Sequence, residues 1–387
     1  MVQTINSLGL AKKPKETRVV VAMSGGVDSS VTAALLHEQG YDVVGISLQL
    51  YDHGAAISKS KACCAGQDIY DAGRVADRLN IPHYVLDYED KFKSDVIEKF
   101  ASSYVEGETP IPCVLCNQTV KFRDLVKTAR EIDSDLLATG HYIRRVDNDG
   151  VQQLHRAVDH SRDQSYFLFS TTPEQIDFLR FPLGSYTKSE VRDLARRYDL
   201  LTSEKPDSQD ICFVPNGNYG DIVQKLRPES GEPGDIVDKY GNILGRHKGI
   251  IHYTIGQRRG LGIGGRSGIS DKDSILYVTS IEADTCRIVV GNKSDLSLNT
   301  VFVKEINWLG FGETPPTNGI DILVKVRSTQ DPVPATLYGG LNGHGKIELV
   351  EPEFGIAPGQ AAVFYDNTRL LGGGWIIKSE CLSKERV

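Results

Sequence analysis

The chain has 387 residues, 40% of them hydrophobic and 25% charged, and its mean hydropathy is −0.26. This length predicts two or three globular domains, and the composition excludes a disordered, collagen-like or coiled-coil chain. The sequence has neither an apolar run of the ~20 residues that cross a bilayer nor a signal-peptide centre, so we expect a cytoplasmic protein. A net charge of −7 argues against indiscriminate coating of nucleic acid but allows a local basic patch.

The first half of the chain alternates strand and helix patterns. Short strand patterns lie at residues 18–23, 41–50, 83–88 and 135–139, and helical patterns lie at 29–39, 68–79, 91–104 and 119–131. Such alternation is typical of an α/β fold in which helices cover both faces of a parallel sheet. We therefore predict a doubly wound parallel-sheet domain over residues 1–216.

From about Gly217 the helical signal fades. Residues 234–247 (GDIVDKYGNILGRH) predict a hairpin that turns at 240–242, and beyond Leu276 the pattern is one of short strands broken by turns. Asn342-Gly343 is a strong hairpin-turn signal. We predict a small central domain over residues 217–276 and a C-terminal antiparallel β-barrel over residues 277–387.

A glycine-rich loop, Ser-Gly-Gly-Val-Asp-Ser-Ser at residues 24–30, directly follows the first predicted strand. Two glycines let the backbone curl around an anion, the following helix offers unpaired N–H groups, and the serine hydroxyls are further donors. No Gly-Lys-Ser/Thr follows, so this is not a Walker A loop. The pattern predicts a phosphate cradle, and the alternative is a simple serine-capped turn.

Two later strand ends are candidates for holding the rest of a nucleotide. Ligands of open parallel sheets bind beyond the carboxyl ends of the strands. Leu48 follows the second predicted strand and Gly140 a later one. We expect Leu48 to pack near a base and Gly140 to allow close backbone approach, although Leu48 alone would equally suit a core position.

The seven cysteines are odd in number, in a long chain without an export signal, which favours thiols kept for chemistry or metal over a disulfide framework. Cys113 and Cys116 form a CxxC ahead of the predicted helix at 119–131. The dipole of that helix, with Lys121 and Arg123, is expected to favour the Cys116 thiolate. Cys212, in a polar loop, is the third candidate. A zinc half-site or two packed thiols are the alternatives for the CxxC.

A basic stretch runs from Arg246 to Arg266 and holds five Lys or Arg residues and no acid. Such a stretch can follow a phosphate backbone even on an acidic protein. Arg258 and Arg259 lie at its centre and are our candidates for binding nucleic acid. The alternative is a solvated basic loop.

Eight motifs occur in order along the chain: SGGVDSS, ACC, TPIPCVLCNQTVKF, ATGHYIR, DQSYFL, PLGSYTKSEVR, DSQDICFVP and GQRRGLGI. Together they resemble the tRNA-specific 2-thiouridylases of the ATP-pyrophosphatase superfamily over almost the full length. The resemblance implies an N-terminal ATP-pyrophosphatase domain, a central domain and a C-terminal barrel. It also implies ATP-dependent 2-thiolation of the wobble uridine (U34) of tRNA, with Mg²⁺ as cofactor. The implied partners are the tRNA anticodon region and a sulfur donor such as a cysteine desulfurase or a relay protein.

The resemblance also assigns roles to single residues. It makes Cys116 the catalytic nucleophile and Cys212 the carrier of a persulfide, and it gives Asp28 the task of organising Mg²⁺. The implied ATP-binding residues are Ala22, Met23, Ser24, Gly25, Gly26, Val27, Asp28 and Ser29, with Leu48 and Gly140. The implied tRNA-binding residues, besides Arg258 and Arg259, are Ile111, Pro112, Cys113, His141, Arg162, Asp163, Gln164, Arg327, Ser328 and Gln360.

One position departs from the commoner family pattern. Where many relatives have an acidic residue three before the LCN cysteine, this chain has Cys113. The general acid–base role sometimes assigned to that carboxylate therefore does not carry over. Cys113, Cys116 and Cys212 would instead supply three thiolates, which suits a [4Fe–4S] cluster with one open iron. Two sulfur routes stay open, and we favour the persulfide.

Two rival functions also remain at this point. One is another ATP-pyrophosphatase ligase acting on a small metabolite, which would need neither Cys116 and Cys212 nor the basic stretch. The other is a non-catalytic nucleotide-sensing module that binds tRNA. Turnover of ATP to AMP that depends on tRNA would separate all three functions.

Overall fold

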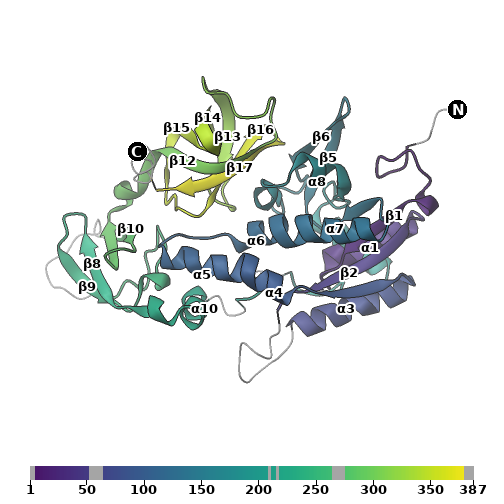
Figure 1. The fold of residues 1–387 in the computed structure, drawn as a ribbon, viewed down its shortest axis with the longest axis horizontal. Helices are drawn as coiled ribbons and strands as arrows, with labels where there is room; N and C mark the ends of the chain where they lie inside the picture. The colour runs from purple at the N-terminus through teal and green to yellow at the C-terminus, as the bar shows by residue number, and fades with distance from the viewer. Residues whose placement is uncertain (1–4, 52–63, 208–210, 215–217, 264–274, 379–387) are drawn as a thin grey trace. The chain divides into compact units, whose positions relative to one another are not determined.

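The computed structural model describes residues 5–51, 64–207, 211–214, 218–263 and 275–378. The chain divides into two compact units. The first holds residues 1–95, 114–209 and 368–370, and the second holds residues 96–113, 210–367 and 371–387. Figure 1 labels many of their helices and strands. In these described ranges no helix has the length and apolarity to cross a membrane.

The first unit is built on a five-stranded sheet in the order β3-β2-β1-β4-β7. All four pairings are parallel, which confirms the predicted doubly wound sheet. At its centre Val20 lies opposite Val44 and Leu137. The strands are β1 (Arg18–Ala22), β2 (Asp42–Gln49), β3 (His83–Asp87), β4 (Leu136–Ala138) and β7 (Leu179–Arg180).

Helices cover both faces of this sheet. Residues from α1 (Val27–Glu38), α3 (Cys64–Leu79) and α9 (Lys188–Arg197) share one hydrophobic core with Val19 and Val21 of β1. Val20 points to the other face, because side chains alternate along a strand, and it too is completely buried. The helix that ends in α7 (Val126–Glu131) contacts β4.

That helix begins earlier than its sequence pattern predicts. It starts with α6 (Pro112–Leu115), continues through a π-helical stretch (Cys116–Leu125) and ends in α7, whereas the pattern placed its start near residue 119. Proline suits the first turn of a helix, where its missing N–H costs no hydrogen bond. The early start moves both cysteines of the CxxC into the helix.

Other elements of the first half were partly unforeseen. An antiparallel hairpin, β5 (Ile143–Asn148) and β6 (Val151–Arg156), turns at Asp149-Gly150, where both residues have positive φ. Asp-Gly is a common two-residue turn of antiparallel hairpins. The predicted helix at 91–104 is α4 (Glu89–Phe92), a π-helical stretch (Lys93–Ile97) and α5 (Glu98–Val105). Helix α8 (Pro173–Phe178) precedes β7.

In the second unit, four strands form a sheet in the order β10-β11-β8-β9. The predicted hairpin is present as β8 (Gly234–Asp238) and β9 (Ile243–His247). Strands β10 (Tyr277–Glu282) and β11 (Arg287–Gly291) join it, because β11 pairs in parallel with β8. This sheet therefore runs to Gly291, beyond the boundary expected at residue 276. Helix α10 (Tyr219–Leu226) precedes it.

The rest of the second unit is a closed six-stranded antiparallel barrel, as predicted. Its order is β12-β15-β14-β13-β16-β17, and β12 also pairs with β17. Asn342-Gly343 forms the expected turn, between β14 and β15, with both residues at positive φ. The strands are β12 (Ser297–Trp308), β13 (Ile320–Lys325), β14 (Val333–Gly339), β15 (Gly345–Phe354), β16 (Ala361–Asp366) and β17 (Arg369–Ile377).

Candidate nucleotide site and its cysteines

The loop at residues 24–30, or phosphate loop, connects β1 to α1. Helix α1 begins at Val27 with Gly26 as its N-cap. Its serines hold the loop itself: Ser29 Oγ accepts from the Ser24 N–H at 3.1 Å, and Ser30 Oγ donates to the Gly26 carbonyl at 2.8 Å. In this structure both hydroxyls stabilise the turn, and their expected hydrogen bonds to a ligand stay a prediction. The first turn of an α-helix has N–H groups without an intrahelical acceptor, and such groups are suitable donors to an anion.

Gly140 lies against this loop. A Cβ atom at Gly140 would lie 2.9 Å from both the Asp28 carbonyl carbon and the Ser29 nitrogen. Gly140 therefore packs closely against the loop at residues 24–30, whereas its predicted approach to a nucleotide stays a prediction. Leu48 is half-buried near the carboxyl end of β2.

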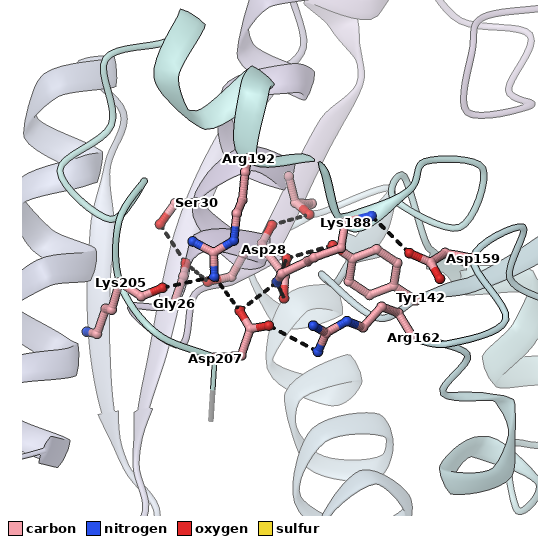
Figure 2. A network of polar contacts seen from close by, with 12 residues as sticks. Gly26, Asp28, Ser30, Tyr142, Asp159, Arg162, Lys188, Arg192, Lys205 and Asp207 are labelled. Atoms are coloured by element: carbon pink, nitrogen blue, oxygen red, sulfur yellow. Dashed lines mark hydrogen bonds and ion pairs between the residues drawn. The ribbon is translucent and has the colours of Figure 1, made fainter. Parts of the chain in front are cut away.

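Asp28 anchors an ion-pair network that the sequence analysis missed (Figure 2). Its carboxylate accepts from Lys188 Nζ at 2.8 and 2.9 Å and from the Tyr142 hydroxyl at 2.8 Å. Lys188 is the first residue of α9, and its side chain is 11% exposed. Burial and the neighbouring Asp28 raise the pKa of Tyr142, so its hydroxyl stays protonated and donates.

Asp207 is the second carboxylate of this network. It pairs with Lys188 at 2.9 Å, Arg192 at 3.0 Å and Arg162 at 3.1 Å. Burial by itself would raise the pKa of Asp207, but the hydrogen bond and charge of Lys188 and the nearby arginines lower it. Three cations thus share two carboxylates beside the start of α1. A third carboxylate, Asp159, accepts from the Lys188 N–H at 3.0 Å, so the cationic and anionic side chains of the cluster are equal in number.

A further lysine contacts the other end of the loop. Lys205 Nζ donates to the Gly25 carbonyl at 3.0 Å, to Asp68 at 2.7 Å and to Asp71 at 2.5 Å. The motif PLGSYTKSEVR contains Lys188, and Lys205 lies two residues before the motif DSQDICFVP. Both motifs were recognised, but neither lysine was assigned a role.

Cys116 is buried, in the second turn of the helix that starts at Pro112. Burial raises the pKa of its thiol, and the charge of Lys121 opposes that shift only in part. Lys121 donates to the Asn117 side chain, and Arg123 pairs with Asp124. The predicted activation of Cys116 by a helix N-terminus is wrong, because the helix begins four residues before it.

The other two candidate thiols differ from Cys116 in exposure. Cys113, in the first helical turn, and Cys212 are both exposed. They belong to the second unit, whereas Cys116 belongs to the first.

Among the expected tRNA-binding residues of the first unit, Arg162 keeps 41% of its side chain exposed. Asp163 is only 1% exposed; it pairs with Arg156 at 3.1 Å and accepts from the Ala157 N–H. Gln164 accepts from the Tyr142 N–H. The side chains of Asp163 and Gln164 therefore make hydrogen bonds within the first unit. Of these three neighbouring residues, only Arg162 exposes a charged group to solvent.

His141 follows Gly140 and lies against the rings of Phe122 and Phe181. Its Nδ1 shares a 2.8 Å hydrogen bond with Thr139 Oγ1. Burial, with a smaller contribution from the charge of Lys121, holds the pKa of His141 well below its usual value, so the ring is neutral at physiological pH.

The remaining tRNA-binding candidates lie in the second unit. Arg258 and Arg259 are exposed and form no ion pair within the described residues. Arg327 pairs with Glu353 at 3.1 Å, and Gln360 donates to the Thr109 carbonyl at 2.9 Å, which holds the segment before the CxxC. Ile111 and Pro112 are buried, Ser328 is half-buried, and Arg266 lies outside the described residues.

In the part of the chain that the structure describes, no group of three His, Cys, Asp or Glu side chains could hold a metal ion. Mg²⁺ commonly binds through one carboxylate together with substrate phosphates, and Asp28 fits that arrangement.

A parallel sheet whose first strand runs into a Ser-Gly-Gly loop and a helix N-terminus defines an α/β nucleotide-binding protein of the phosphate-loop class. Family models match in the same order: a tRNA methyl transferase HUP domain at residues 17–216, a tRNA methyl transferase PRC-barrel domain at 220–292 and an aminomethyltransferase β-barrel domain at 298–376.

Curated relatives match over nearly the whole chain. The tRNA-specific 2-thiouridylase MnmA of Rhodospirillum centenum is 59% identical over 377 residues, covering 97% of this chain and 95% of that protein. The MnmA of Paracoccus denitrificans is 59% identical over 376 residues, covering 96% and 95%. The chain belongs to the tRNA-specific 2-thiouridylase family, as the motifs indicated.

Proposed function

We propose that this protein catalyses ATP-dependent 2-thiolation of the wobble uridine (U34) of tRNA through an adenylated base. Membership of the 2-thiouridylase family supports the overall reaction. The observation that carries the mechanism is the loop at residues 24–30. This loop leads into the N-terminus of α1, near the side chains of Lys188 and Arg162. The family models for the HUP and PRC-barrel domains are both described as tRNA methyl transferase domains. A ligase acting on a small metabolite would need neither such domains nor the motifs around Cys116 and Cys212.

In the first half-reaction the C2 oxygen of the uridine attacks the α-phosphorus of ATP. The bond between the α-phosphorus and its bridging oxygen breaks, pyrophosphate leaves, and the base loses its N3 proton. The N–H groups at the start of α1 bind the leaving pyrophosphate, and Lys188 and Arg162 neutralise its growing charge. Mg²⁺, held by Asp28 when bound with ATP, would supply further charge neutralisation.

In the second half-reaction the terminal sulfur of a Cys212 persulfide attacks C2, and AMP leaves. The Cys116 thiolate then attacks the inner sulfur of Cys212, which breaks the persulfide bond and leaves the sulfur on the base. The products are 2-thiouridine and a Cys116–Cys212 disulfide, which an external thiol reductant returns to two thiols. Burial disfavours the Cys116 thiolate, so we expect Cys116 to react only once substrate has changed its surroundings.

Serine variants of the three cysteines test this sulfur route. Purified protein is given ATP, a sulfur donor and tRNA, and 2-thiouridine is measured by mass spectrometry of digested nucleosides. Cys116→Ser and Cys212→Ser should each abolish the product, whereas Cys113→Ser should keep much of the activity. A Cys113→Ser protein that is inactive, and that loses iron which the parent holds when purified anaerobically, would refute the persulfide route and favour a cluster.

A further inference from the structure

A lysine from a distant segment holds one carbonyl of the phosphate loop. Lys205 lies 180 residues after Gly25 in the chain, and its Nζ donates to the Gly25 carbonyl at 3.0 Å. The same ammonium group donates to Asp68 and Asp71 of α3 at 2.7 and 2.5 Å. Three oxygen acceptors from two elements therefore fix the position of one side chain that is 25% exposed.

The backbone at Gly25 has little room to move if its contact with Lys205 changes. Its φ is +73°, and a Cβ atom there would lie 2.0 Å from the Asp68 carbonyl oxygen, so the loop touches the backbone of α3 directly. In a planar trans peptide the C=O and the following N–H point in opposite directions. Because Lys205 holds the Gly25 carbonyl on one side, the Gly26 N–H faces the other side.

The segment that carries Lys205 is itself braced. Arg192 donates to the Ser203 carbonyl at 2.9 Å and to the Lys205 carbonyl at 3.3 Å, and it pairs with Asp207. Figure 2 shows Lys205 and Asp207 on this segment beside Gly26 and Asp28. Residues 203–207 therefore reach both ends of the loop, through Lys205 at Gly25 and through Asp207 and Lys188 at Asp28.

We propose that Lys205 is a positioning residue of the nucleotide site, which orients the Gly25–Gly26 peptide so that the Gly26 N–H faces the pyrophosphate part of ATP. The inference rests on the proposed function in one respect, that the nucleotide bound by this loop is ATP. Lys205 acts through the loop and touches no phosphate itself. Its loss therefore affects the binding of pyrophosphate-containing ligands and leaves the binding of AMP unchanged.

Calorimetric titration of the full-length protein with ATP and with AMP tests the proposal. Lys205→Met should weaken ATP binding about tenfold, the effect of misaligning one hydrogen bond to a charged group, and should leave AMP affinity within about twofold. Equal losses for ATP and AMP would show a general structural role and overturn the proposal. If the Met variant does not fold, Lys205→Arg, which keeps the charge but moves the donors, should still weaken ATP and spare AMP.

A double variant separates positioning from charge. Lys205→Met leaves Asp68 and Asp71 without their cation near the phosphates, and Lys205→Met combined with Asp71→Asn restores the original net charge. We expect the double variant to bind ATP as weakly as the single one, because the Gly25 carbonyl is still not held. Recovery of wild-type ATP affinity would assign the effect to charge and contradict the proposal.

Arg78→Met, which removes an exposed ion pair with Asp199, is the matched control and should bind both nucleotides normally. Wild-type protein that bound no ATP would refute the proposed function together with this inference. Wild-type binding with an unaffected Lys205→Met variant would refute this inference alone.

Discussion

The carboxylate of Asp28, in the first turn of α1, lies 2.8 and 2.9 Å from the ammonium group of Lys188, the first residue of α9. The N-termini of two helices that are far apart in the chain thus meet at one ion pair. Helix N-termini favour anions. Here a carboxylate lies at the N-terminus of α1, and a lysine lies at the N-terminus of α9. An entering phosphate would compete with Asp28 for Lys188, which frees Asp28 to bind Mg²⁺.

Asp28→Ala should therefore lower adenylation of tRNA by at least about a hundredfold, since both the Mg²⁺ ligand and the partner of Lys188 are lost. Affinity for tRNA should not change. Single-turnover formation of the adenylate and a filter-binding titration measure the two effects separately. Normal adenylation by this variant would mean that the loop has another task.

Gly140→Ala should weaken ATP binding by about tenfold or more, because the added methyl group would push the Asp28–Ser29 backbone out of place. Gly73→Ala is the control: its methyl group would find only His83 at 3.8 Å, in the middle of α3. ATP affinities of the two variants, measured beside their thermal midpoints, test this packing. If both variants bound ATP normally, the contact between Gly140 and the loop would not matter.

Cys116 should react slowly with iodoacetamide in the free protein. Its pKa is raised by burial, so the thiolate fraction is small at neutral pH and grows as the pH rises toward and through that raised pKa. Exposed Cys113 should be alkylated faster at pH 8. Peptide mass spectrometry over a pH series gives both rates, and faster labelling of Cys116 than of Cys113 at pH 8 would contradict the burial argument.

Replacing Arg258 and Arg259 by alanine should weaken tRNA binding and reduce its salt slope by up to about two, because each phosphate contact releases condensed counterions. ATP binding should be unaffected. Both guanidinium groups are exposed, so their loss costs the fold little. An unchanged salt slope in titrations at several salt concentrations would indicate that these arginines lie in a solvated loop and do not contact phosphates of tRNA.

Sequence patterns predicted those features that depend on neighbouring residues. The strand–loop–helix unit at residues 18–38 and the turn at Asn342 are local, and both are present. Strand β14 contains Pro334, a residue that is rare inside a sheet, so the sequence by itself argues against a strand there. The helix that contains Cys116 begins at Pro112, and proline is common both in turns and in the first turn of a helix, so the local sequence does not fix this start.

The contacts of Lys188 and Lys205 could not be found in this way. Each lysine reaches the phosphate loop across 160 or more residues, and no local pattern reports such a pairing. A motif marks the lysine, but only the fold shows which oxygen it contacts. The same holds for Asp163 and Gln164, whose polar groups look available in the sequence and are used inside the first unit.

In the proposed reaction the phosphate loop binds ATP so that U34 of tRNA attacks its α-phosphorus. The most direct test incubates the protein with tRNA and with ATP labelled at either the α- or the γ-phosphate, without a sulfur donor, and measures label bound to the tRNA. We expect transfer of the α-label only, and we expect this transfer to be lost when U34 is replaced by cytidine. Transfer of the γ-label, or transfer of the α-label that does not need U34, would contradict it.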